Sequence, residues 1–250
     1  MQLPSEVSKS KKSFFRKLHW RSKSSCEYSA DQTKQISSSQ LPSVLCDCIL
    51  YLKEFGLTTT GLFRVPGEAS KVKFLQEAYH TNKTGVLQTG EYSVHDVAGL
   101  LKLSIRQLEI PLVPFHVYKK ILREFRKVGE QGWFHRRRGS TGSPGAENLA
   151  NSVCEVALKN LSDEQIRGLS MILNLLFVVS SLSAVNKMTT QALAIVFAPT
   201  LMSVPDDVAP QVVLRDMPIA IAATKILIEN ASALPTPDML EILENSSVVA

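Results

Sequence analysis

Apolar residues recur with helical spacing along most of the chain after residue 40. The segment from Leu41 to Phe55 places apolar side chains at positions i, i+3 and i+4, and Gly56 supplies a stop signal. The same spacing predicts further helices at residues 69–79, 94–108, 118–127, 163–182, 189–198 and 217–231. No segment shows the alternation of a half-buried strand, so the sequence predicts an all-α fold.

The ends of the helix predicted at 94–108 are marked by particular residues. Ser93 stands at its N-cap, and Asp96 occupies the third helical position, where a carboxylate favours the positive end of a helix. Pro111 and Pro114 follow it and forbid its continuation. This helix should therefore begin and end close to these residues.

Several features favour a cytoplasmic protein. The most apolar run, residues 169–182, spans only 14 positions and is predicted to be a buried core helix, because a bilayer needs about 20. The start of the chain has no apolar stretch of the kind found in secretory signals. The four cysteines show no paired spacing, so we expect reduced thiols.

The positive charge is concentrated at the start of the chain. The first 40 residues hold eight Lys and Arg against three acidic residues, and the remaining 210 residues balance to zero. We predict a basic, Ser-rich arm at 1–38, a domain at 39–232 and a tail at 233–250. A neutral domain argues against nucleic-acid binding. The arm mixes cations with Phe14, Phe15, Leu18 and Trp20, which suits peripheral binding to anionic membrane; the alternative is a disordered tail.

Residues 129–146 are rich in Gly and polar side chains and are predicted to form a long loop, inserted into the domain. Within it, Arg136, Arg137 and Arg138 lie close to Ser140, Thr141 and Ser143. These residues form either a charge cluster controlled by phosphorylation or a solvated loop without a function.

Motifs of familiar enzymes are missing from the sequence. Gly56 and Gly61 have the spacing of a phosphate-binding loop, but the next two positions are Leu62 and Phe63 instead of Lys and Ser or Thr. The five histidines are scattered without the spacing of metal ligands, and no G-x-S-x-G elbow is present. We expect no metal, no cofactor and no self-contained active site.

Three cations stand in otherwise apolar surroundings. Arg64 follows Leu62 and Phe63, which should anchor its loop while glycines and a proline shape a backbone that presents the guanidinium outward. Lys102 and Arg106 share one face of a predicted helix at i and i+4 spacing. Either an anion from outside compensates this pair, or the two side chains extend from the core to solvent.

Three blocks of this sequence, in order, resemble the signature of the Rho GTPase-activating protein (RhoGAP) domain family. They are "GLFRVPG", "VHDVAGLLKLSIRQLEIPLVP" and "NKMTTQALAIVFAPTLM", within a similarity that spans about residues 41–231. The resemblance implies an all-helical fold of about nine helices. It also implies a partner, a GTP-bound Rho-family small GTPase of the Rho, Rac or Cdc type.

The resemblance assigns roles to individual residues. It makes Arg64 the arginine finger, a catalytic group inserted into the active site of the partner, so the protein would be an activator and not itself an enzyme. It places Lys102 at the GTPase interface near the finger loop and gives Arg106 a hydrogen bond that holds this loop. Pro114, in the second block, is counted among the GTPase-binding positions.

Two positions depart from the family pattern. Thr200 and Ala192 stand where the family often has Asn, and a lost amide hydrogen bond would weaken binding by up to about tenfold. Asn186 to Met188 match the family, which we attribute to helix packing and capping. Two functions follow: a working GTPase activator, or a binding module and scaffold that stimulates hydrolysis poorly.

Overall fold

The computed structural model describes residues 43–81, 85–89, 91–128 and 144–234. All of them belong to one compact unit, residues 39–250. The predictions for the arm at 1–38, for the loop at 129–143 and for the tail after residue 234 fall outside the described residues. In the described ranges no helix has both the length and the apolar character that crossing a membrane requires.

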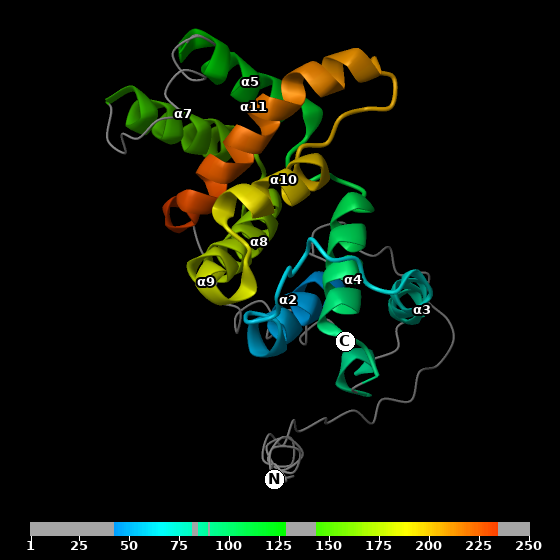
Figure 1. The fold of residues 1–250 in the computed structure, drawn as a ribbon. Helices are drawn as coiled ribbons and strands as arrows, with labels where there is room; N and C mark the ends of the chain where they lie inside the picture. Colours follow the sequence, from blue (N-terminus) through cyan, green and yellow to red (C-terminus); the bar gives the residue numbers. More distant parts are fainter. Residues whose placement is uncertain (1–42, 82–84, 90, 129–143, 235–250) are drawn as a thin grey trace. The chain divides into compact units, whose positions relative to one another are not determined.

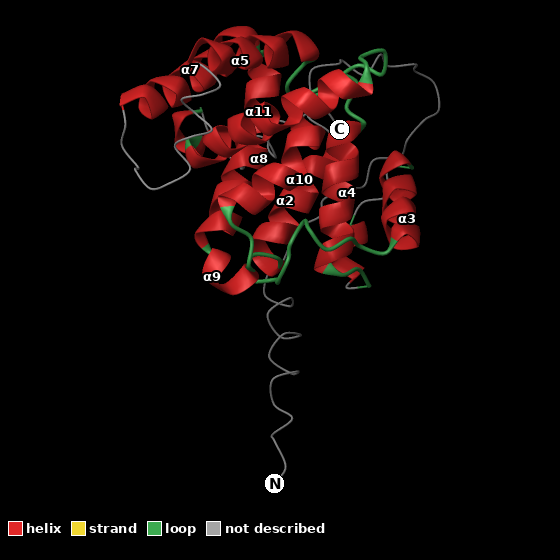
Figure 2. Ribbon diagram, turned by 45° about the horizontal axis from the view of Figure 1, so that its top comes forward, coloured by secondary structure: helices red, strands yellow, loops and turns green. Residues whose placement is uncertain are grey.

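The prediction of an all-α fold is confirmed. The described ranges contain nine α-helices and no β-strand, and Figure 2 shows only helices and connecting loops in them. The α-helices are α2 (Ser43–Phe55), α3 (Ala69–His80), α4 (Val94–Arg106), α5 (Phe115–Val128), α7 (Pro144–Asn160), α8 (Asp163–Ser181), α9 (Ser183–Asn186), α10 (Thr190–Leu201) and α11 (Pro210–Glu229). Two short 3₁₀ helices, η1 (Val86–Thr89) and η2 (Ala231–Ala233), complete them.

The long helices share one core, and α8 contributes more buried apolar side chains to it than any other described helix. Helix α4 contacts α2, α3 and α10, and at the other end of the unit α5, α7 and α11 contact one another (Figure 1). The apolar run predicted as a core helix forms most of α8, where Leu169, Leu173 and Leu176 are fully buried. The unit is therefore held by helix-on-helix burial of apolar surface.

Two helices are longer than the sequence pattern predicts, although both contain a proline. Helix α10 continues past Ala198 through Pro199, and α11 begins at Pro210, seven residues before the predicted start, and contains Pro218. Pro199 and Pro218 are exposed, so the carbonyl groups that lose their hydrogen-bond partners face solvent. Packing of α10 against α11 holds both helices despite these breaks.

The predicted loop at 129–146 is wrong in its last three residues, because α7 begins at Pro144. Proline is well suited to the first turn of a helix, since its missing N–H would have no partner there. The sequence prediction also missed the rest of α7, although its buried residues Leu149, Val153 and Ala157 recur every four positions. The Gly- and Ser-rich composition before α7 obscured this spacing.

The three cysteines in the described ranges, Cys46, Cys48 and Cys154, are free, as predicted from their spacing, and all three are buried. Burial raises the pKa of the thiols of Cys46 and Cys154, so neither is an activated nucleophile. These cysteines contribute to packing in the core.

Candidate functional site

Arg64 is presented to solvent by a loop that follows α2, residues 56–68, which we call the arginine loop. Leu62 and Phe63 are completely buried, and the next three residues, Arg64, Val65 and Pro66, are exposed. The apolar pair thus anchors the loop in the core, and Arg64 is left at the surface. The sequence predicted this outward presentation, and the exposure of Arg64 confirms it.

Two residues of the arginine loop have a left-handed backbone conformation. Gly61 has φ of 71° and Phe63 has φ of 69°. The amides of Arg64 and Val65 both donate hydrogen bonds to the carbonyl oxygen of Gly61, each at 2.9 Å. A positive φ at a bulky residue such as Phe63 costs about 1–3 kcal/mol and persists only where surrounding contacts impose it.

Two contacts hold Phe63 in this strained conformation. Its ring meets the ring of Phe197 from α10 edge to face, with centroids 4.9 Å apart and planes inclined at 81°. Its carbonyl oxygen accepts a hydrogen bond from Lys102 Nζ at 2.6 Å. Core packing and a charged donor therefore act on the residue directly before Arg64.

Asn186 supports the arginine loop from the core. Its fully buried side chain donates from Nδ2 to the carbonyl oxygens of Leu57 at 2.8 Å and Val179 at 2.7 Å, and its Oδ1 accepts from the amide of Met188 at 2.8 Å. The carbonyl oxygen of Asn186 also accepts from the amide of Gly61 at 2.8 Å. One residue thus ties both the start and the middle of the loop to α8 and α9.

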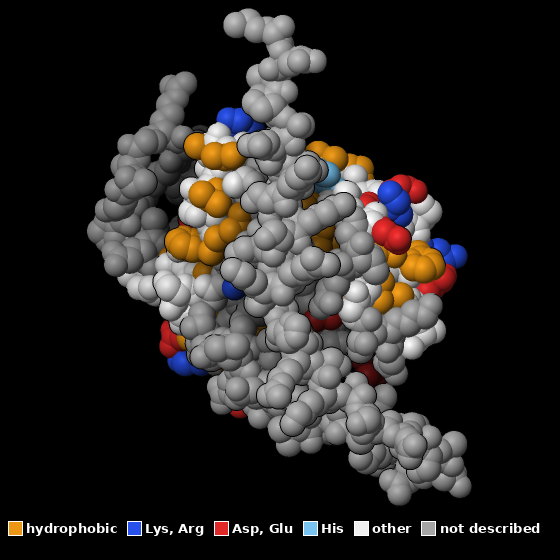
Figure 3. All heavy atoms as spheres, turned by 90° about the horizontal axis from the view of Figure 1, so that it is seen from below, with side chains coloured by type: hydrophobic (Ala, Val, Ile, Leu, Met, Phe, Trp, Pro, Cys, Tyr) orange, Lys and Arg blue, Asp and Glu red, His pale blue; other side chains and the backbone are white. Residues whose placement is uncertain are grey.

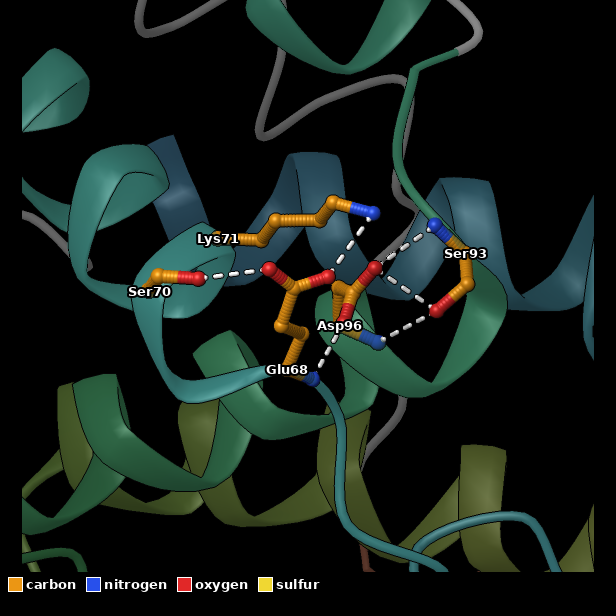
Figure 4. Close-up of polar contacts among 5 residues, drawn as sticks. All are labelled: Glu68, Ser70, Lys71, Ser93 and Asp96. Atoms are coloured by element: carbon orange, nitrogen blue, oxygen red, sulfur yellow. Dashed lines mark hydrogen bonds and ion pairs between the residues drawn. The ribbon is translucent and has the colours of Figure 1, made fainter.

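Asp96 fastens the far end of the arginine loop to α4 (Figure 4). Its Oδ1 accepts a hydrogen bond from the amide of Glu68 at 2.7 Å, and its Oδ2 accepts from the amide and hydroxyl of Ser93 at 2.8 and 2.7 Å. The predicted cap is therefore a capping box that also holds the residue before α3. Glu68 is joined in turn to Ser70 and Lys71.

The electrostatics of Asp96 follow from these contacts. Burial raises the pKa of the Asp96 carboxyl, but hydrogen bonds from Ser93 and Glu68 and the charge of Lys71 outweigh burial, so the pKa lies below its ordinary value. The carboxylate is therefore ionised wherever the protein works near neutral pH. An ionised acceptor forms stronger hydrogen bonds to main-chain amides.

Gly67 allows the arginine loop to approach α4 closely. A Cβ atom at this position would stand 2.6 Å from Asp96 Cα and 2.7 Å from His95 O, both of them main-chain atoms that cannot move alone. The second glycine of the sequence block "GLFRVPG" is thus required by space, whereas Gly61 is required by its positive φ.

A hollow beside the arginine loop is lined by several cationic side chains, and we call it the cationic hollow. It lies between α3 and α4 and is lined by Pro66, Gly67, Ala69, Val72, Lys73, Gln76, Gly99, Lys102, Leu103 and Arg106, with no carboxylate among them. Burial lowers the pKa of Lys102, and the positive charge of Arg106 lowers it further. Lys73 pairs with Glu77 at 3.9 Å, whereas Lys102 and Arg106 have no carboxylate partner among the described residues. These two cations can therefore meet negative charge from a partner without displacing an internal counter-ion.

Lys102 and Arg106 have different surroundings. Lys102 is half-buried and holds Phe63, whereas Arg106 is exposed and donates no hydrogen bond to the arginine loop in the described structure. The loop-holding hydrogen bond expected from Arg106 is thus made by Lys102. Their common face on α4, predicted from the i, i+4 spacing, is confirmed by the hollow that both line.

The other predicted positions lie on or near α10. Ala192 is half-buried in the first turn of α10, where its amide donates to Thr189 Oγ1, and Thr200 is 8% exposed near the end of the helix. Val113 forms an isolated bridge with Met202, which brings Pro114 to the same end of α10 as Thr200. Helix α10 contacts α4, but Ala192 and Thr200 do not line the cationic hollow.

The surface around these elements carries hydrophobic side chains as well as charges. Figure 3 shows exposed hydrophobic side chains interspersed with cations and carboxylates over the described part of one face. Val65 beside Arg64 is 42% exposed, and Ile195 on α10 is 53% exposed. A partner that covered this surface would contact apolar as well as charged side chains.

The predictions from the sequence missed two contacts that support the arginine loop. The pattern S-x-x-D predicted the cap by Asp96 but gave no indication of its bond to Glu68, 28 residues away. Asn186 was expected to serve packing and capping, while its bond to Leu57 spans 129 residues. Local spacing carries no information on such contacts.

Comparisons with known proteins identify relatives of the chain. Rho GTPase-activating protein 24 from Homo sapiens is 31% identical over 169 residues, which are 68% of this chain and 20% of that protein. Rho GTPase-activating protein 22 from Mus musculus is 32% identical over 161 residues, 64% of this chain and 21% of that protein. The chain thus spans about a fifth of the length of these curated relatives.

Solved structures share the fold. The BH domain from GRAF, the GTPase regulator associated with focal adhesion kinase, superposes with a TM-score of 0.61 at 21% identity, covering 78% of this chain and 96% of that one. Human Rho GTPase activating protein 15 gives a TM-score of 0.63 at 19% identity, covering 76% and 81%. These proteins therefore share the helical arrangement of this chain although their sequence identity to it is low.

The family assignment rests on a match that covers most of the chain. The family model of the RhoGAP domain matches residues 42–206, which include the arginine loop, α4 and α10. With this match, and with the helical fold described above, the chain belongs to the RhoGAP domain family.

Proposed function

We propose that this protein activates GTP hydrolysis by a Rho-family small GTPase and that Arg64 is the arginine finger it supplies. Negative charge builds on the phosphates in the transition state, and a small GTPase of this class lacks an arginine of its own there. A guanidinium brought by a partner stabilises that charge. Its contribution is about 10³ to 10⁵ in rate, or roughly 4–7 kcal/mol.

The observation that supports this proposal most strongly is the fixed presentation of Arg64. The loop on either side of it is held by Lys102, by Asn186 and by Asp96, while Arg64 itself is exposed. Such anchoring lowers the entropy lost when the guanidinium enters the active site of a partner. The cationic hollow beside it adds positive charge that favours approach to a nucleotide-bearing surface.

The test is single-turnover hydrolysis of GTP by Rho-, Rac- and Cdc-type GTPases in the presence of the wild type, Arg64→Ala or Arg64→Lys. We expect the wild type to stimulate at least one of them by orders of magnitude. Arg64→Ala should lose most of this stimulation. Arg64→Lys should recover little, because an ammonium lacks the planar fork that contacts two oxygens at once.

Arg167→Ala is the matched control. Arg167 is exposed on α8, and the substitution removes the same charge as Arg64→Ala. It should leave stimulation unchanged. Stimulation that survives in Arg64→Ala, or that falls equally in the control, would contradict the role of Arg64. The GTPase that responds best would identify the preferred partner.

The alternative function is a GTPase-binding module that stimulates hydrolysis poorly. It is favoured by the two α10 positions, because Thr200 is nearly buried and Ala192 has no polar side-chain atoms, so neither supplies an amide to a partner. Binding to a GTPase loaded with a non-hydrolysable GTP analogue separates the two functions. Tight binding without stimulation of hydrolysis would establish the module, and restoring Asn in Thr200→Asn should then strengthen the complex.

We also propose, from the sequence, that the basic arm at 1–38 attaches the protein to anionic membrane. Eight cations and the aromatic residues Phe14, Phe15 and Trp20 carry this proposal. The full chain in which Lys11, Lys12, Arg16 and Lys17 are changed to Gln should bind phosphatidylserine vesicles more weakly than the wild type in a pelleting assay. Equal binding of the variant and the wild type would show that the arm does not attach the protein to membrane.

A further inference from the structure

Helix α5 separates apolar and cationic side chains onto opposite faces. Its buried face is formed by Val117, Tyr118, Ile121, Leu122 and Phe125, which pack into the core. Lys119, Arg123, Arg126 and Lys127 follow at i, i+4, i+7 and i+8 and are all exposed. We call these four residues the basic face of α5.

The charge on α5 stands out from the rest of the unit. The helix holds five Lys and Arg and one Glu in 14 residues. Residues 41–250 have no net charge, so all of that span outside α5 carries four net negative charges. Such a concentration on one exposed helix face is an electrostatic footprint for an anionic partner.

Internal contacts neutralise only part of the basic face. Arg126 pairs with the nearly buried Asp216 at 3.1 Å, and Lys127 pairs with Glu124 at 2.7 Å. Lys119 and Arg123 have no carboxylate partner among the described residues, and the ammonium of Lys119 stands 4.8 Å from the centroid of the Phe115 ring. These two cations are available to a ligand at no cost in internal ion pairs.

Aliphatic side chains lie next to these cations. Lys119, Arg123 and Arg126 line a hollow together with Val212 and Val213 from the first turns of α11. Val212 is 37% exposed. Leu214, two positions further along α11, does not line this hollow, but at 72% it is more exposed than any other large hydrophobic residue in the described ranges. The loop before α11 carries Asp206 and Asp207, so the cationic surface ends there.

We propose that the basic face of α5, with the exposed aliphatic residues of α11, is a binding surface for anionic phospholipid membrane. Lipid phosphates meet Lys119 and Arg123, and the side chains of Leu214 and Val212 enter the boundary between headgroups and acyl chains. An acidic polypeptide would satisfy the cations but would leave isolated aliphatic side chains at the rim of its binding site. A membrane satisfies both, which decides between the two.

The position of this surface leaves the arginine loop accessible. In both ribbon views α5 and α7 lie at one end of the helical unit, and the loop between α2 and α3 lies toward the other end (Figures 1 and 2). Membrane and GTPase can therefore bind at the same time. This surface is independent of the proposed activity and of the arm, because it uses neither Arg64 nor residues 1–38.

The test is pelleting of the full chain with phosphatidylcholine vesicles that contain or lack phosphatidylserine. The wild type should bind only the anionic vesicles, and less so as salt shortens the screening length from about 10 Å at 0.1 M to about 3 Å at 1 M. Lys119→Gln with Arg123→Gln should bind about thirty-fold more weakly, at about 1 kcal/mol for each cation near the surface. Arg123→Gln alone should bind about fivefold more weakly.

Arg167→Gln with Lys187→Gln is the control, because it removes the same charge from exposed positions on α8 and directly after α9. It should bind like the wild type, and all variants should unfold at the same temperature. Since the arm is present in every variant, a loss confined to α5 reports on this surface alone. The proposal would be overturned if the α5 variant bound as well as the wild type, or if the control lost as much binding. It would also be overturned if the wild type did not bind anionic vesicles.

Discussion

Lys102 donates a hydrogen bond from its Nζ to the main-chain carbonyl oxygen of Phe63, and the two atoms lie 2.6 Å apart. Phe63 is the strained, buried residue directly before Arg64. A side chain on α4 therefore sets the backbone from which the proposed arginine finger projects. This relation couples the cationic hollow to the arginine loop, because Lys102 belongs to both.

Removing the ammonium of Lys102 should impair stimulation of hydrolysis more than stability. Lys102→Met keeps the aliphatic stem and releases the carbonyl of Phe63, and a hydrogen bond from a charged donor contributes about 1.5–3 kcal/mol. We expect the stimulated single-turnover rate to fall by about 10- to 100-fold. The unfolding temperature should change little, because the partly buried charge, whose pKa is lowered by burial, is also removed. A large loss of stability with an unchanged rate would contradict this role.

Replacing Asp96 should destabilise the domain through two helix ends at once. Asp96→Ala removes the capping box of α4 and leaves the amide of Glu68 without its acceptor, so we expect a loss of about 2–3 kcal/mol in the free energy of unfolding. Asp163→Ala is the control, since Asp163 lies exposed in the first turn of α8 and caps nothing. Its loss should stay below about 1 kcal/mol in urea unfolding. Equal losses would show that helix dipoles alone account for the effect.

The contribution of Asp96 should also depend on pH. Its pKa in the folded state lies below the ordinary value of 3.8, so the folded state binds fewer protons than the unfolded state in this range. The stabilisation is therefore fully present above pH 3.8 and is lost as the pH falls through the lower folded pKa. The difference in unfolding free energy between the wild type and Asp96→Ala should narrow over that window. A difference that stays constant down to the acid transition would count against an ionised Asp96.

Gly67→Ala should be strongly destabilising although it adds a single methyl group. The new Cβ would stand 2.6 Å from Asp96 Cα, so α4 and the arginine loop would have to separate, at a cost of about 1–3 kcal/mol. Gly99→Ala is the control: there the Cβ would meet Val72 Cγ2, a side-chain atom, at 3.0 Å. Movement of Val72 and the higher helix propensity of alanine should leave stability nearly unchanged. Thermal unfolding of both variants decides whether Gly67 is a spacing requirement.

Asn186→Ala should cost about 3 kcal/mol in the free energy of unfolding. Its side chain makes three hydrogen bonds in a fully buried position, and the carbonyl oxygens of Leu57 and Val179 would lose their donor. Asn174→Ala removes an amide that, among the described residues, bonds only to Ser170 in its own helix, and it should cost less than about 1 kcal/mol. Similar losses for the two variants in urea unfolding would show that Asn186 has no special role beneath the arginine loop.

The sequence predicted those parts of the site that depend on local spacing. The positions of Lys102 and Arg106 on one face of α4 follow from the helical period, and the cap at Ser93 and Asp96 follows from a four-residue pattern. The burial of Leu62 and Phe63 beside an exposed Arg64 follows from the apolar pair within a Gly-bounded loop. In each case the chemical groups involved lie within one or two helical turns.

Helix boundaries were predicted less well where two local preferences conflict. Proline argues against a helix interior, yet Pro199 and Pro218 lie inside α10 and α11. The glycines and serines before α7 argue for a loop, yet Leu149, Val153 and Ala157 bury one face of a helix there. Burial of apolar surface between helices outweighs these local preferences.

The sequence by itself determined that the chain is all-helical, that Arg64 lies at the surface of an anchored loop, and that Lys102 and Arg106 share a face, because helical period and loop composition are local properties. Only the tertiary structure decided which groups hold that loop. Lys102 reaches Phe63 across 39 residues, Asp96 reaches Glu68 across 28, and Asn186 reaches Leu57 across 129. Such contacts arise when helices pack, since the packing brings distant donors and acceptors to hydrogen-bonding distance and no local pattern records which will meet.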